Sequence, residues 1–155
     1  MPAMRDYDDP AVIEQWCEER RAQVTTYLHD EGVEHGRVGD WPAWHLAPYI
    51  SIWAIESRTQ SGSIGWWAIC GDVPTDHISA AGIENPRDAM RAVATEWHEL
   101  AKLMSSGESL PNIRIGQPEE WASLAPLLQT RASMLLQWAD DDALWNDLDT
   151  PQNSH

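Results

Sequence analysis

The chain has 155 residues, enough for a domain with a substantial core, and 43% of them are hydrophobic, which is ordinary for a globular protein. Asp and Glu total 25 against 10 Lys and Arg, so the net charge is −15 with histidine neutral. This balance argues against nucleic acid or an anionic membrane surface as the direct partner and is compatible with a basic protein partner or a cationic ligand. No basic-then-apolar leader and no apolar run of membrane-spanning length occurs, so we expect a cytoplasmic protein without a membrane partner.

The first predicted element is a helix over about residues 10–30. Asp9 and Pro10 form a typical helix start, an acidic cap followed by proline at the first helical position. Gly32 marks the expected end, and a Gly- and Pro-containing loop follows. Apolar residues repeat through the helix at helical spacing: Ile13, Trp16, Cys17, Val24, Tyr27 and Leu28.

The two most hydrophobic and β-prone runs predict a β-hairpin over about residues 48–57 and 63–71. Alternation places apolar residues on both faces of each run, so both faces should be covered. A lone two-stranded hairpin is marginally stable in water, so helices must pack on it and a third strand is expected. We predict that Trp53 and Trp67 are largely buried.

After the hairpin, residues 72–77 read as a polar, proline-containing loop, and Asn85 with Pro86 opens a second helix that stops near Gly107. Residues 110–116 are the best candidate for a third strand. A further helical region starts at Pro118, and Pro126 should kink it or break it in two. We therefore predict one α+β domain over residues 1–150, with a small antiparallel sheet packed by three or four helices, and a disordered tail over residues 151–155.

The polar groups nearest the hairpin are the candidates for chemistry. The antiparallel hairpin brings its start and its end together, and carboxylates with imidazoles can bind a divalent metal or transfer protons. No spacing matches a known metal or hydrolase motif, so the alternative is that Asp72 and Asp76 cap turns and His45 is a satisfied, partly buried histidine. We assign no metal and no cofactor. The candidates are His45, Glu56, Asp72, Asp76 and His77.

Ten Trp and no Phe make an unusual aromatic composition. Most of these Trp fall on apolar stripes, which favours a role in the core over stacking on a ligand. Trp41 and Trp44 lie in a Gly/Pro-containing loop and are the candidates for ligand binding. Cys17 and Cys70 lack metal-type spacing, and we interpret them as reduced core residues.

Acidic residues concentrate at the two ends of the chain, where few basic residues accompany them. If the ends meet on one face, their charges form a negative patch that would steer a partner, with Trp145 as its apolar anchor. The alternative is a solvated acidic tail. The predicted partner-binding residues are Asp140, Asp141, Asp142 and Trp145.

Three runs, Trp44–Tyr49, Ser51–Ser57 and Gly65–Asp76, resemble a family of small bacterial proteins catalogued as a domain of unknown function. The last run contains the specific pattern Trp-Trp-Ala-Ile-x-Gly-Asp-x-Pro-Thr-Asp, and the resemblance covers roughly residues 10–105. It implies a single compact bacterial domain and no mechanism.

Two functions follow as hypotheses from the residues themselves. The first is a non-enzymatic acidic binding protein, of the immunity type or regulatory, for a basic protein partner. The alternative is a small metal-dependent or acid–base hydrolase that uses His45, Asp72, Asp76 and His77.

Overall fold

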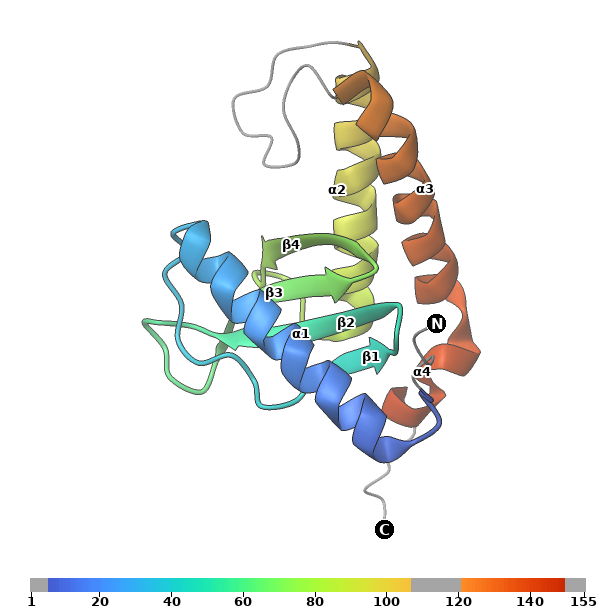
Figure 1. The fold of residues 1–155 in the computed structure, drawn as a ribbon. Coiled ribbons are helices and arrows are strands. Elements are labelled where there is room, and N and C mark those ends of the chain that lie inside the picture. Colours follow the sequence, from blue (N-terminus) through green and yellow to red (C-terminus); the bar gives the residue numbers. More distant parts are fainter. Residues whose placement is uncertain (1–5, 107–120, 150–155) are drawn as a thin grey trace. The chain divides into compact units, whose positions relative to one another are not determined.

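A computed structural model describes residues 6–106 and 121–149. Within these residues the chain forms four helices and a four-stranded antiparallel sheet, which confirms the predicted α+β class (Figure 1). The structure divides after Pro86 into two compact units. The single domain over residues 1–150 stays a prediction, and the candidate strand over 110–116 and the tail over 151–155 lie outside the described residues.

The first unit begins with helix α1 (Pro10–Asp30), which has the predicted bounds. Asp9 caps it, because the Asp9 carboxylate accepts a hydrogen bond from the backbone N–H of Ala11 at 2.9 Å. After the helix, Gly32 has a φ of 69°, a left-handed conformation that favours glycine, and its N–H bonds the His29 carbonyl. Local capping signals thus fix both ends of α1.

The sheet of the first unit has the strand order β1-β2-β3-β4, and each pair of neighbours is antiparallel. The predicted hairpin is confirmed as β2 and β3. Trp53 and Trp67 are 0% and 2% exposed, so their predicted burial is confirmed as well. The strands are β1 (Trp44–Leu46), β2 (Ile50–Glu56), β3 (Ile64–Gly71) and β4 (Val73–Ser79).

The loop predicted over residues 72–77 is wrong, because most of it forms the edge strand β4. Pro74 and its polar neighbours have low strand propensity, but an edge strand tolerates a residue that cannot donate to the ladder. Only Asp72 separates β4 from β3, and its N–H bonds the Tyr49 carbonyl at 2.7 Å. Gly71 has a φ of 137°, and a side chain there would meet that same carbonyl.

Helix α1 covers one face of the sheet, and Figure 1 shows it running across the strands. This face carries the main apolar cluster of the unit, with Val24, Leu28, Val38, Trp53, Ile55, Ala68 and Cys70 at its centre. Residues on the opposite face are also buried, as the alternating pattern predicts. They include Ile50, Ile52, Trp67, Ile69 and Ile78.

The second unit contains helices α2 (Pro86–Ser106), α3 (Trp121–Asp140) and α4 (Asp142–Asp149). Helix α2 begins at the predicted proline, and its start lies beside the end of α3 (Figure 1). Helix α3 continues through Pro126, so the predicted break is wrong. Pro126 is the sixth residue of the helix, so it removes one backbone hydrogen bond, to the carbonyl four residues earlier, and the helix continues on both sides of it. Across the two described segments, no helix has the length and hydrophobicity that a membrane crossing requires.

Candidate functional site

The residues predicted to carry chemistry are divided between the two edges of the sheet. His45 lies in β1 and His77 in β4, which are the opposite edge strands. Asp76 and His77 are brought together, whereas His45 is separated from them by β2 and β3, and Asp72 is exposed in the β3–β4 turn. Among the described residues, no three His, Cys, Asp or Glu side chains form a group that could hold a metal ion.

Asp76 and His77 form a polar cluster with Tyr27 of α1. The Tyr27 hydroxyl lies 2.7 Å from His77 Nδ1 and donates to Asp76 Oδ1 at 3.4 Å. Asp76 is 3% exposed and also accepts a hydrogen bond from the backbone N–H of His77 at 2.8 Å. The His77 ring packs edge-on against Tyr27 and Trp66, with centroids 5.5 and 5.4 Å apart. Asp76 therefore bonds a backbone amide from within strand β4 and not at a turn, and the sequence did not indicate Tyr27 as a partner.

Glu56 holds the connection between β2 and β3. Its carboxylate accepts hydrogen bonds from the backbone N–H of Gly62 at 3.0 Å and of Arg37 at 3.3 Å, and from the Ser61 hydroxyl at 3.4 Å. The backbone bonds from Gly62 and then Arg37 lower the pKa of Glu56. The residue lines an open surface hollow of about 230 Å³. Because its oxygens are occupied by the turn, Glu56 has a structural role at this place.

His45 is partly buried in an aromatic environment beneath α1. Its ring centroid lies 6.3 Å from that of Trp16 and 5.8 Å from that of Trp41. Burial lowers the pKa of His45 below its ordinary value of 6.5, which favours the neutral ring. No described residue bonds its buried Nδ1 atom. The described residues therefore leave one nitrogen of this histidine unsatisfied, contrary to the alternative prediction.

The two tryptophans predicted to bind a ligand differ in exposure. Trp44 is 8% exposed and belongs to the core, so it offers no free face for stacking. Trp41 is 48% exposed and lies edge-on against His45. Of this pair, Trp41 alone presents an accessible indole.

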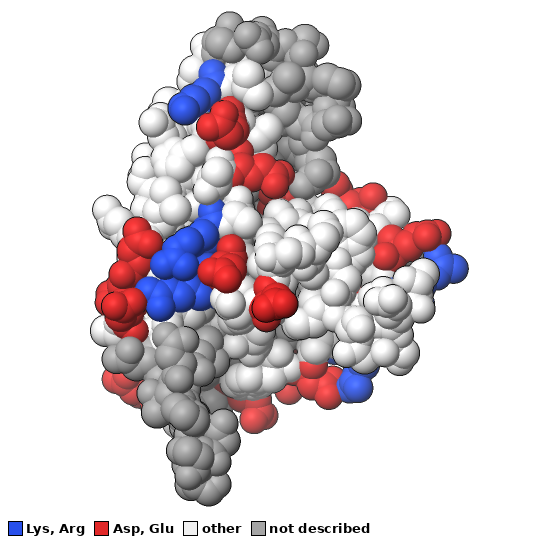
Figure 2. Space-filling view, turned by 180° about the vertical axis from the view of Figure 1, so that it is seen from behind, with Lys and Arg blue, Asp and Glu red and all other residues white. Residues whose placement is uncertain are grey.

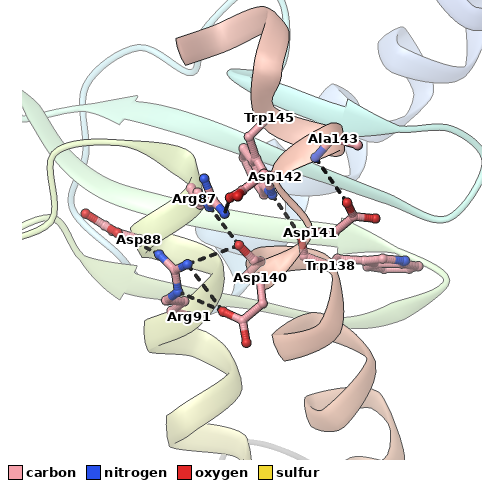
Figure 3. A network of polar contacts seen from close by, with 10 residues as sticks. Arg87, Asp88, Arg91, Trp138, Asp140, Asp141, Asp142, Ala143 and Trp145 are labelled. Carbon is pink, nitrogen blue, oxygen red and sulfur yellow. Dashed lines mark hydrogen bonds and ion pairs between the residues drawn. The ribbon is translucent and has the colours of Figure 1, made fainter.

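The aspartates predicted to bind a partner form a polar network inside the second unit (Figure 3). Arg87 bonds Asp142 at 2.5 Å, and its Nε donates to the Ala139 carbonyl at 2.7 Å. Arg91 pairs with Asp140 at 3.3 Å. The hydrogen bond and the charge of Arg87 lower the pKa of Asp142. The end of α3 is thus less negative than the sequence of aspartates indicates.

Asp141 and Trp145 have further structural roles there. The Asp141 carboxylate accepts a hydrogen bond from the backbone N–H of Ala143 at 3.0 Å and caps α4. Trp145 is 1% exposed, its Nε1 donates to the Trp138 carbonyl at 2.9 Å, and the Arg87 guanidinium lies 5.9 Å from its ring centroid. The Trp145 ring therefore faces the interior and presents no exposed anchor.

Most described basic side chains are engaged with acidic groups of the same chain, and Figure 2 shows basic side chains lying beside acidic ones. Outside the Arg87 network, the ion pairs join Arg20 to Glu19, Arg21 and Arg37 to Asp40, Arg58 to Glu34, and Lys102 to Glu99. By contrast, Glu14 and Glu18 are exposed on α1 and form no ion pair with a described residue. The start of α1 is therefore a place of uncompensated negative charge.

Together, these features define an α+β fold in which a helix covers one face of an antiparallel sheet. The chain belongs to the family described as Domain of unknown function (DUF4826), whose model matches residues 11–145. The match extends past the predicted range of 10–105 and includes α3 and the first part of α4. No curated protein and no solved structure matches the chain.

Proposed function

We propose that this protein is a non-enzymatic binding protein whose partner is a basic protein. The observation that carries the proposal is the charge along the start of α1. Four acidic residues are exposed there, and the basic residues that follow them in the helix are partly buried. We call this surface the acidic stripe, and its members are Asp8, Asp9, Glu14 and Glu18.

The neighbouring arginines do not neutralise the acidic stripe. Arg21 donates from Nε and Nη2 to the carbonyls of Gly39 and Val38, both at 2.8 Å, so its guanidinium is held against the loop before β1. Arg20 lies over the ring of Trp16, with 5.6 Å from Cζ to the centroid. The stripe therefore keeps a negative field that would speed the approach of a basic surface.

The predicted surface at Asp140, Asp141 and Asp142 is the second contact surface in this proposal. A basic partner would have to compete there with Arg87 and Arg91, which already pair with two of the aspartates. The acidic stripe carries no such competition from the described residues. We therefore assign the main contact to the stripe.

An immunity-type or regulatory role fits a surface of this kind. Neutralising a basic protein requires fast association, which complementary charge provides. The proposal includes a bacterial cytoplasmic setting, where the free and buried thiols of Cys17 and Cys70 would stay reduced.

The test compares two variants with the same change in charge. The wild type, Glu14→Gln/Glu18→Gln and Asp140→Asn/Asp142→Asn are used to capture partners from the native cell, and binding to the purified partner is then measured at low and physiological salt (about 0.15 M). We expect a basic partner whose association slows in the Glu14→Gln/Glu18→Gln variant and slows much less in the aspartate variant. An acidic partner, or an association rate that neither variant changes, contradicts the proposal.

One observation favours the alternative function, an acid–base hydrolase. The 2.7 Å contact between the Tyr27 hydroxyl and His77 Nδ1, with Asp76 bonded to both residues, resembles a proton-transfer arrangement. Since His45 lies in the opposite edge strand, this alternative depends on Tyr27, Asp76 and His77. It is tested with p-nitrophenyl acetate and p-nitrophenyl phosphate. Hydrolysis above the buffer rate that is lost in His77→Gln would favour the enzyme.

A further inference from the structure

Two buried polar atoms of the first unit have no hydrogen-bond partner among the described residues. They are Nε of Arg20 and Nδ1 of His45. Buried polar groups are almost always paired in folded proteins, because leaving one unpaired forfeits its hydration without compensation. Within the described part of the chain, each of these two nitrogen atoms thus lacks the hydrogen-bond partner that a buried polar group normally has.

Arg20 and His45 approach the same aromatic ring. The Arg20 Cζ atom lies 5.6 Å from the Trp16 ring centroid, and the His45 ring centroid lies 6.3 Å from it. The two side chains therefore flank Trp16.

The backbone pairing places them in the same region. His45 pairs with Ser51, Ser51 pairs with Cys70, and the Cys70 thiol donates to the Arg20 carbonyl at 3.7 Å. These three strand residues form a row on the sheet face that α1 covers. Helix α1 sets Trp16 and Arg20 over this row.

Trp41 connects this region with the surface. Its indole is 48% exposed and lies edge-on against the His45 ring at 5.8 Å. An exposed indole next to a half-buried imidazole offers an apolar surface to a small planar molecule. Such a molecule would lie beside His45, whose Nδ1 is one of the two unpaired nitrogen atoms.

We propose that Trp16, Arg20, Trp41 and His45 form a binding site for a small aromatic carboxylate. A carboxylate is the preferred partner of a guanidinium group, and its first oxygen would accept from Arg20 Nε. Its second oxygen would accept from His45 in the tautomer that is protonated at Nδ1. The aromatic body of the ligand would lie on Trp41. Because the chain carries a charge of −15, multiply charged anions are repelled and a single carboxylate is the class that fits.

The test uses benzoate as the probe and benzyl alcohol, which has the ring without the charge, as its control. Each is titrated into the isotope-labelled full chain while the indole N–H signals of Trp16 and Trp41 are followed by NMR. We expect saturable shifts of these signals with benzoate and none with benzyl alcohol. The affinity should fall about tenfold or more in Arg20→Gln and in His45→Phe, since each loses one hydrogen bond to the carboxylate.

Arg37→Gln is the matched control, because it removes an exposed arginine of the same unit that pairs with Asp40. Its affinity for benzoate should equal that of the wild type. Trp41→Ala changes an exposed residue and serves as a further variant if a substitution at Arg20 or His45 prevents folding. It should also weaken binding. Absence of a saturable shift with benzoate, equal shifts with benzyl alcohol, or unchanged affinity in the folded site variants would each overturn the proposal.

Discussion

Trp53 donates its indole N–H to the hydroxyl of Ser51 at 2.9 Å, and both side chains are fully buried. They lie two residues apart in β2 and therefore point to the same face of the sheet. The Ser51 hydroxyl in turn donates to the Cys70 carbonyl at 3.2 Å. One small polar group thus allows a large indole to be buried with its N–H satisfied.

Ser51→Ala should lower the free energy of unfolding by about 1–3 kcal/mol, because it leaves the buried Trp53 N–H without its partner. The control is the same substitution in a Trp53→Phe background, where there is no indole N–H to satisfy and the loss should be smaller. Urea denaturation of the wild type, the two single variants and the double variant gives the coupling free energy between Ser51 and Trp53. Equal losses in the two backgrounds would contradict the role of this hydrogen bond.

Trp53→Ala and Trp67→Ala should each cost about 3–5 kcal/mol of stability, the range for truncating a large buried aromatic side chain. Trp41→Ala is the control, since its side chain is 48% exposed, and it should cost less than about 1 kcal/mol. Denaturant unfolding measures all three. A loss below about 1 kcal/mol at both buried positions would mean that the hairpin does not form the core of its unit.

The stability of the protein should depend on the protonation of His45. Its folded pKa lies below the ordinary 6.5 because of burial, so the unfolded state binds the proton more readily. The neutral ring contributes fully to the free energy of unfolding above about pH 6.5. This contribution is lost as the pH falls through the lower folded pKa of His45. We expect the free energy of unfolding to fall over this window and to fall less in His45→Gln. An NMR titration of the His45 ring provides the direct check, and a pKa at or above 6.5 would contradict it.

Both cysteines should be unreactive in the folded protein. Burial raises the pKa of Cys17 to about 11 and also raises that of Cys70, and the thiolate is the reactive form. At about pH 8 a thiol reagent should label them no faster than the protein unfolds. Labelling in denaturant is the control. Rapid modification of Cys70 without denaturant would show that the α1–sheet interface opens.

Asp141→Ala should lower stability by about 0.5–2 kcal/mol, because it removes the side chain that caps α4. Asp142→Asn should have a smaller effect, since exposed ion pairs contribute little. Thermal unfolding of the two variants ranks them. The reverse order would mean that the pair with Arg87 matters more than the cap.

Elements with local signals could be predicted from the sequence. The bounds of α1 follow from Asp9, Pro10 and Gly32, and β2 and β3 follow from dense runs of β-prone residues. Strand β4 could not be found in this way, because Pro74 and Asp76 depress its propensity and pairing with β3 stabilises it. Pro126 led to the opposite error, a predicted break where the helix is continuous, because α3 accommodates the loss of the one hydrogen bond that this proline removes.

The candidate site was harder to predict because its contacts join distant parts of the chain. His77 was named as a candidate, but its partner Tyr27 lies 50 residues earlier and looked like one member of an apolar helical stripe. In the same way, the aspartates at the end of α3 looked unpaired, although Arg87 bonds Asp142 from 55 residues away. The i,i+4 spacing in α1 places Arg20 beside Trp16, but no local pattern marks either residue as a neighbour of the row that holds His45.

The close approach of Gly71 to the Tyr49 carbonyl limits where the chain can be modified. A Cβ atom there would lie 2.5 Å from the Tyr49 carbonyl oxygen, and the Asp72 N–H bonds that same oxygen. The β1–β2 and β3–β4 turns are thus hydrogen-bonded to each other. An inserted residue or a new chain terminus in either turn would therefore disturb the other turn as well. The exposed residues 58–63 at the other end of β2 are joined to the loop before β1 through side chains, by the Arg58–Glu34 ion pair and by the Glu56 carboxylate that bonds Gly62 and Arg37. A fluorescent label or a circular-permutation site belongs in that segment.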